Sequence, residues 1–263
     1  MSWIAALFAL FAWWFSTGVI LFVVRRADRT GQHRLVVLGS VPVAVMGAAL
    51  VVASLGLNSV LGAYLGFVGA LLIWGWIELA FLAGIVTGPV TEPCPQDLTG
   101  LPRFVRAFGT VSYHELLLVL GLWGLIAVSS GAENRMALGT FLVLFLARIC
   151  AKLNLFFGVP RINTEFVPDR LVHLKTYFTQ GPITFAFPVA ITVLTAVLAV
   201  CAERLWHAGN EVTIAGFGLL TALTALALLE HWLMVVPLPD AKLWRWMLPA
   251  PKTEAQKDQT HGF

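Results

Sequence analysis

Long apolar runs separated by short polar segments make up most of this chain. Seven runs of about 18 residues or more carry few charges, and they fall at residues 3–24, 35–55, 60–86, 111–129, 136–157, 182–202 and 212–236. A helix rises about 1.5 Å per residue, so about 20 residues cross a hydrocarbon core of roughly 30 Å. We therefore predict an all-α integral membrane protein with seven transmembrane helices in a single domain, residues 1–250, followed by a polar tail, residues 251–263.

The composition supports this class of protein. Hydrophobic residues make up 59% of the 263 residues and charged residues 12%, whereas a soluble domain has about 25% charged residues. The three cysteines lie in separate segments without metal-finger spacing, which argues against a disulfide framework or a zinc knuckle. No basic cluster is interleaved with aromatic residues, so nucleic-acid binding is not indicated. Arg25 and Arg26 follow the first run in place of a cleavage site, which predicts a retained helix.

The positions of lysine and arginine predict the orientation in the membrane. With the loop after the first helix on the cytoplasmic side, fifteen of the 17 lysines and arginines fall on that side or at its border. Only Arg135 and Arg204 fall on the opposite side. Short cytoplasmic loops carry an excess of these residues. We therefore predict a periplasmic N-terminus and a cytoplasmic C-terminus.

Three local patterns refine the predicted helices. Pro42 lies inside the second run and predicts a kink, because proline removes one backbone hydrogen bond. Gly62 and Gly66 have the GxxxG spacing, which we interpret as close packing within the chain in preference to a dimer face. Trp244 and Trp246 follow a Pro-Leu-Pro break near the C-terminus. They predict a short segment at the membrane interface.

The segment 152–178 is the longest internal stretch that is too polar for lipid, and it reads KLNLFFGVPRINTEFVPDRLVHLKTYF. Gly158 and Pro168 interrupt helix formation in it. It also contains Glu165 and His173. On the predicted topology this segment lies at the cytoplasmic ends of the helices. We expect it to form the floor of a polar site in the cytoplasmic leaflet.

Ionisable residues inside the apolar runs come to a similar depth. Glu78 lies about 18 residues, or roughly 27 Å, from the outer end of its helix, and Glu230 and His231 reach a similar depth in the last helix. His114 and Glu115 begin the fourth helix from the same side. A charged side chain at the bilayer centre costs about 2.5–3.5 kcal/mol, so such residues normally face the protein interior and have partners. These groups are therefore expected to meet.

Two main interpretations of this polar zone stay open. In the first, the glutamates pair with Arg148 and Lys152, which lie four residues apart on one helix face and form a polar network with Asn154. In the second, carboxylates and imidazoles bind iron, manganese or zinc. The candidate metal ligands are Glu78, His114, Glu115, Glu165, His173, Glu230 and His231. The Glu-x-x-His pair of di-iron helical bundles is absent from the sequence.

Two further interpretations concern protons and pigments. The same groups would suit a path for protons or a quinone. His114, His173 or His231 would suit a single axial ligand to a tetrapyrrole magnesium or a haem iron. Trp74 and Trp76 are interpreted as packing residues, and His33, His207 and His261 are given no role. The sequence has no phosphate-binding glycine loop and no recognisable nucleophile with a base.

Three stretches resemble a known family. They are the segment 152–178, the sequence EHWLMVVPLP at 230–239, and WGWIELAFLAGIVTGP at 74–89. Together with the length and the number of helices, they are similar to the PuhE family of photosynthetic complex assembly proteins from phototrophic bacteria. The resemblance implies a multi-pass protein of the bacterial cytoplasmic (intracytoplasmic) membrane that affects assembly of the reaction centre and core antenna, or bacteriochlorophyll supply to them. It transfers no catalytic residues.

Three functional hypotheses follow. The first is a non-enzymatic assembly factor whose helices contact the bilayer and engage reaction-centre or core-antenna subunits, or their pigments. The second is a membrane enzyme, a metal-dependent and di-iron-like oxidoreductase acting on a tetrapyrrole, quinone or other lipid-soluble substrate. The third is a carrier for a pigment precursor, which predicts a pocket open to the inner leaflet. The corresponding cofactors are a divalent metal such as iron, or bacteriochlorophyll or a precursor of it.

Overall fold

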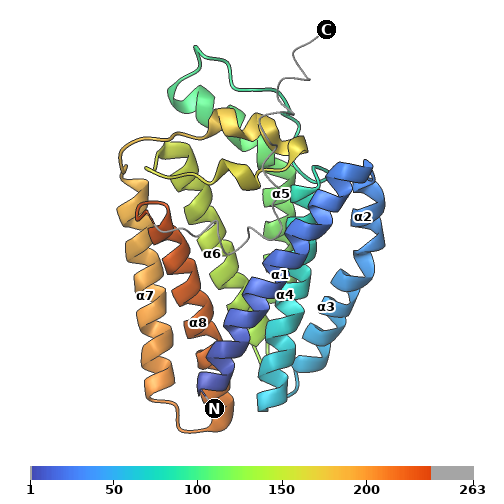
Figure 1. Cartoon of the computed structure of the whole chain (residues 1–263). Coiled ribbons are helices and arrows are strands. Elements are labelled where there is room, and N and C mark those ends of the chain that lie inside the picture. The colour runs from blue at the N-terminus through green and yellow to red at the C-terminus, as the bar shows by residue number, and fades with distance from the viewer. Residues whose placement is uncertain (1, 238–263) are drawn as a thin grey trace, which may run out of the picture.

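The computed structural model describes residues 2–237, and their secondary structure is helical (Figure 1). The helices are α1 Ser2–Thr30, α2 His33–Gly39, α3 Val41–Ser54, α4 Val60–Leu82, α5 Gly100–Val128, α6 Met136–Phe157, α7 Ala186–Trp206 and α8 Glu211–Leu233, with two 3₁₀ helices, η1 Thr164–Phe166 and η2 Asp169–Tyr177. Seven spans are long and apolar enough to cross a membrane, with α2 and α3 together forming one of them. The predicted fold class is confirmed.

Two predictions for the C-terminal region lie outside the described residues. These are the interfacial segment around Trp244 and Trp246 and the polar tail 251–263. The orientation of the termini stays a prediction from the basic residues. What the fold does establish is which loops share an end of the bundle. The segments 83–99 and 158–185 gather at the end where α1 finishes, opposite the start of α1 (Figure 1).

Two helices are longer than predicted. α1 continues through Arg25 to Thr30, and α5 begins at Gly100, eleven residues before the predicted start at 111. Pro102 lies in the first turn of α5, where the backbone N–H groups have no partner within the helix. By contrast, α6 has the predicted bounds.

The predicted kink at Pro42 is a break between two helices. α2 ends at Gly39, and Pro42 occupies the first turn of α3, where its missing N–H costs no helical hydrogen bond. The Ser40 hydroxyl at the break donates to the Val37 carbonyl at 2.9 Å. The proline therefore redirects the chain within the second span, as the sequence predicts.

Glycines allow α3 and α4 to pack closely. A Cβ atom on Gly69 would lie 2.8 Å from the Gly47 carbonyl oxygen, and one on Gly47 would lie 2.9 Å from the Gly69 carbonyl oxygen. Small residues at helix contacts in membranes allow such backbone approach. Gly62 and Gly66 also face other parts of this chain, near Leu57 and Met136 respectively. This agrees with the interpretation of packing within the chain.

The tilt of α1 shapes the bundle. Near its start, α1 packs on α8, where a Cβ on Gly218 would lie 3.1 Å from the Ala5 Cβ. Ala5 and Ala9 belong to a buried cluster with Phe67 and Leu219. Figure 1 shows α1 leaning away from α8 toward α2 at its other end. The two helices that begin in contact therefore separate toward the end that carries the long loops.

Candidate functional site

Two ion pairs join α4, α5 and α6 near the end of the bundle that carries the long loops. The Arg148 guanidinium on α6 donates to Glu78 Oε2 on α4 at 2.5 Å. One turn further along α6, the Lys152 ammonium pairs with the Glu115 carboxylate on α5. Both glutamates are buried. Arg148 and Lys152 share one face of α6 because they are four residues apart, so a single helix face neutralises acids from two neighbouring helices.

An aromatic ring lies between these two pairs. The guanidinium carbon of Arg148 is 5.9 Å and the Lys152 nitrogen 5.6 Å from the centroid of the Phe81 ring. Cations within about 6 Å of a ring face are attracted to it. The His114 ring lies 4.3 Å from Phe81 between ring centroids. Phe81 is therefore a common neighbour of both cations and the histidine.

His114 is enclosed but forms no side-chain hydrogen bond with the described residues. It is 0% exposed, and its Nε2 lies 3.7 Å from Glu78 Oε1, which is too long for a hydrogen bond. Neither ring nitrogen has a hydrogen-bond partner among the described residues. His114 and Glu78 are thus neighbours, as the shared depth predicts, without being joined.

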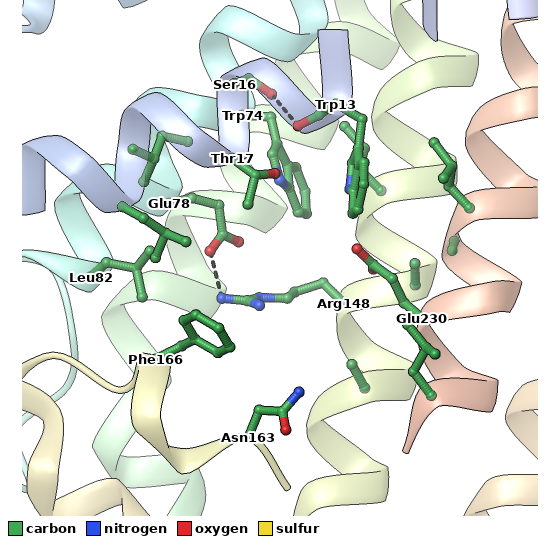
Figure 2. Close-up of a pocket in the computed structure, with 18 of the residues that line it drawn as sticks. Trp13, Ser16, Thr17, Trp74, Glu78, Leu82, Arg148, Asn163, Phe166 and Glu230 are labelled. Carbon is green, nitrogen blue, oxygen red and sulfur yellow. Dashed lines mark hydrogen bonds and ion pairs between the residues drawn. The ribbon is translucent and has the colours of Figure 1, made fainter. Parts of the chain in front are cut away.

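Glu230 has a different environment from the other two membrane glutamates. It is exposed even though four helices surround it, because its side chain faces a cavity. In Figure 2 its carboxyl points toward the indole of Trp13 on α1, which is its hydrogen-bond partner. Arg148 lines the same cavity and interacts electrostatically with Glu230. Arg148 therefore lies between Glu78 and Glu230.

The cavity has a volume of about 500 Å³ and is partly open. Its walls come from α1, α4, α6 and α8, and most of the lining is aliphatic or aromatic. The polar groups of Glu78, Arg148 and Glu230 gather together within it, with Trp13 and Trp74 beside them (Figure 2). A site of this volume with apolar walls and a few polar groups is typical of small-molecule binding sites.

The polar segment 152–178 closes one end of the cavity. Ile162, Asn163 and Phe166 contribute to its lining. Arg161 fixes this segment to the end of α8: its backbone N–H donates to the Met234 carbonyl at 3.0 Å, and its guanidinium donates to the Val236 carbonyl at 2.6 Å. A cation is favourable beside the free carbonyls of a helix C-terminus. The segment thus lies at one end of the cavity, and its position on the cytoplasmic side stays a prediction.

The other predicted site residues lie apart from the ion pairs. His231 is buried and donates from Nδ1 to the Ala227 carbonyl at 2.7 Å. Glu165 is exposed on η1. His173 is half-buried on η2, and burial lowers the pKa of its imidazole. Asn154 is buried, and its amide has no hydrogen-bond partner within residues 2–237.

The seven metal-ligand candidates are therefore not brought together. Across the part of the chain that the structure describes, no three His, Cys, Asp or Glu side chains are grouped so that they could hold a metal ion. Glu78 and His114 are adjacent, Glu115 faces Lys152, and Glu230 faces the cavity. The metal site stays a prediction without support from this geometry.

Sequence reasoning missed two contributions to the structure. His33 was given no role, but it is buried, and its Nε2 lies 2.8 Å from Asp28 Oδ1, which links the end of α1 to α2. Gly31, with a φ of +71°, makes the turn between them. Trp76 packs as expected and donates to the Val37 carbonyl at 3.3 Å, whereas Trp74 both packs on Phe141 and lines the cavity.

Fold and site together define a seven-span membrane protein with an internal charged network and a partly open cavity. The chain belongs to the family described as "Protein of unknown function (DUF3623)", which matches residues 1–255. It is 47% identical over 256 residues to a Rhodobacter capsulatus protein described as "Uncharacterized 30.4 kDa protein in puhA 5′region". That match covers 97% of this chain and 93% of the relative. No solved structure matches.

Proposed function

We propose that this protein is a membrane-embedded assembly factor for the bacterial photosynthetic reaction centre and core antenna, or for bacteriochlorophyll supply to them. The observation that carries the proposal is the Rhodobacter capsulatus relative, whose gene lies in the puhA region, a photosynthesis gene cluster. The relative aligns along nearly its whole length with this chain, so the two are expected to share one architecture and one role. On this proposal the protein acts in the bacterial cytoplasmic or intracytoplasmic membrane, as the resemblance to the PuhE family also implies.

The arrangement of the site favours binding over catalysis. Arg148 and Lys152 are each committed to a buried glutamate, and such pairs fix how helices pack in a membrane. The cavity beside them offers a place for a lipid-soluble molecule or an apolar part of a partner. Both features suit a protein that holds a membrane component during assembly.

A deletion experiment tests the proposed role. We expect that removing the gene of the relative from Rhodobacter capsulatus lowers reaction-centre and core-antenna absorption in phototrophically grown membranes several-fold. Expression of this chain from a plasmid is expected to restore it, because the two proteins are 47% identical. The measurement is the near-infrared absorption spectrum per milligram of membrane protein.

Two controls make the result decisive. An empty plasmid gives the baseline of the deletion, and the gene of the relative on the same plasmid gives full restoration.

An affinity tag on this chain is then expected to recover reaction-centre or antenna subunits, or their pigments, from detergent-solubilised membranes. Unchanged spectra in the deletion, together with no photosynthetic component in the pull-down, would refute the assembly role.

A further inference from the structure

The cavity combines apolar walls with one polar side. Leu71, Val143 and Leu226 are among its aliphatic lining residues, and Trp13 and Trp74 add aromatic surface. Among its charged lining residues, Glu78, Arg148 and Glu230 gather together (Figure 2), and Arg161 joins the lining from the segment 152–178. A cavity with this lining fits a molecule with a large apolar body and a compact polar head.

The charges select the kind of polar head. A guanidinium has five N–H donors, and the hydrogen bond of Arg148 to Glu78 engages only one of its nitrogens. The Arg148 side chain is 32% exposed, so it also presents donors to the cavity. Glu230 presents hydrogen-bond acceptors a short distance away. The matching ligand has one oxygen that accepts from Arg148 and one hydroxyl that donates to Glu230.

The same charges disfavour two other classes of ligand. A carboxylate or phosphate near Arg148 would meet two carboxylates, Glu78 and Glu230. The second cation of the lining, Arg161, donates to the Val236 carbonyl beyond the end of α8. A metallotetrapyrrole held by imidazole finds no histidine in the described lining, since His114 and His231 are both enclosed elsewhere. A neutral ring with carbonyl or hydroxyl oxygens carries no negative charge for the carboxylates to repel, and it needs no histidine ligand.

The tilt of α1 bears on how a ligand could enter. α1 and α8 touch at Ala5 and Gly218 and then diverge, and the cavity lies where they have separated. Its lining includes Trp13 and Ile20 from α1 and Leu226 and Glu230 from α8. Both helices are long and apolar enough to span the membrane. The cavity is partly open, and we assign the side between these two helices as the way in for a lipid-soluble molecule.

We propose that this cavity binds a neutral, ring-headed lipophile of the quinone class, taken in from the bilayer between α1 and α8, with the quinol hydrogen-bonded to Arg148 and Glu230. The apolar tail of the molecule extends toward the bilayer. The proposal concerns binding alone and includes no electron transfer. It is independent of the proposed assembly role, because binding of added probes is measured with the purified protein alone.

Binding of two probes in lipid nanodiscs tests the proposal. The purified full-length chain is placed in phosphatidylcholine nanodiscs and titrated with decylubiquinone and with decylubiquinol, and bound probe is measured after separation, with empty nanodiscs as the partition control. We expect saturable binding of about one molecule per chain. Glu230→Leu is expected to weaken quinol binding about tenfold or more, as loss of a hydrogen bond to a charged group does, and to leave quinone binding within about twofold.

A matched pair of substitutions tests the location. Ala151 lines the cavity, whereas Ala225 on α8 is exposed outside the lining. Ala151→Phe is expected to abolish saturable binding of both probes, and Ala225→Phe to leave it unchanged. Binding no greater than partition into empty nanodiscs would overturn the proposal. Equal binding by Ala151→Phe and Ala225→Phe would also overturn it. So would an equal loss of quinone binding and quinol binding in Glu230→Leu.

Discussion

Replacing Arg148 by methionine is expected to remove most of the folded protein. The substitution leaves Glu78 buried without the cation that lies 2.5 Å from it. Breaking a buried ion pair by removing one partner costs about 3–5 kcal/mol, because the remaining charge is left uncompensated. Total protein stability is only about 5–15 kcal/mol. The expected result is a large fall in the free energy of unfolding, measured by unfolding in mixed micelles of increasing dodecyl sulfate content.

Two comparisons separate charge imbalance from loss of packing. The double variant Arg148→Met with Glu78→Gln has no unpaired charge and is expected to recover most of the lost stability. Arg204→Met removes an exposed arginine. The Arg204 side chain is 67% exposed and that of its partner Glu203 is 60% exposed. Such exposed pairs contribute about 0–1 kcal/mol, so this variant is expected to unfold as the unsubstituted protein does. If Arg148→Met matched Arg204→Met, the buried pair would not stabilise the bundle.

Filling the cavity is expected to abolish the protein's role in the cell while leaving its fold intact. In the Rhodobacter capsulatus deletion strain, Ala151→Phe is expected to restore no more absorption than the empty plasmid, because its ring occupies the site next to Arg148. Ala225→Phe carries the same added volume on an exposed position and is expected to restore absorption fully. Immunoblots of the membranes establish that both variants accumulate equally. Full restoration of absorption by Ala151→Phe would show that the assembly role does not require the cavity.

Most of the architecture can be read from the hydrophobic pattern, since each span needs about 20 apolar residues. The bounds of α6 follow directly, and the pairing of Arg148 and Lys152 with buried acids follows from their spacing of four residues. The extra length of α1 and α5 was not predicted, because their polar end turns read as loops. Helices can continue past the hydrocarbon core where water and neighbouring side chains satisfy polar groups.

The grouping of the site residues could not be predicted from depth alone. Successive residues on a helix point about 100° apart, so Glu230 faces the cavity while His231 turns into the packed interior. Depth placed both at one level and suggested one shared site. The cavity itself depends on the tilt of α1, whose apolar residues lie on all sides and carry no signal for the direction of the lean. Only the three-dimensional arrangement shows that the Glu78–Arg148 pair and Glu230 line the cavity and that His231 does not.

Extraction of bound lipophiles from protein purified from phototrophic membranes tests most directly whether the cavity is a binding site. Solvent extracts of the unsubstituted chain and of Ala151→Phe, matched for protein, are compared by liquid chromatography and mass spectrometry. We predict about one ring-headed lipophile with carbonyl or hydroxyl oxygens per unsubstituted chain, and its loss from Ala151→Phe. Phospholipids alone, in equal amounts from both proteins, would contradict a ligand site between α1 and α8.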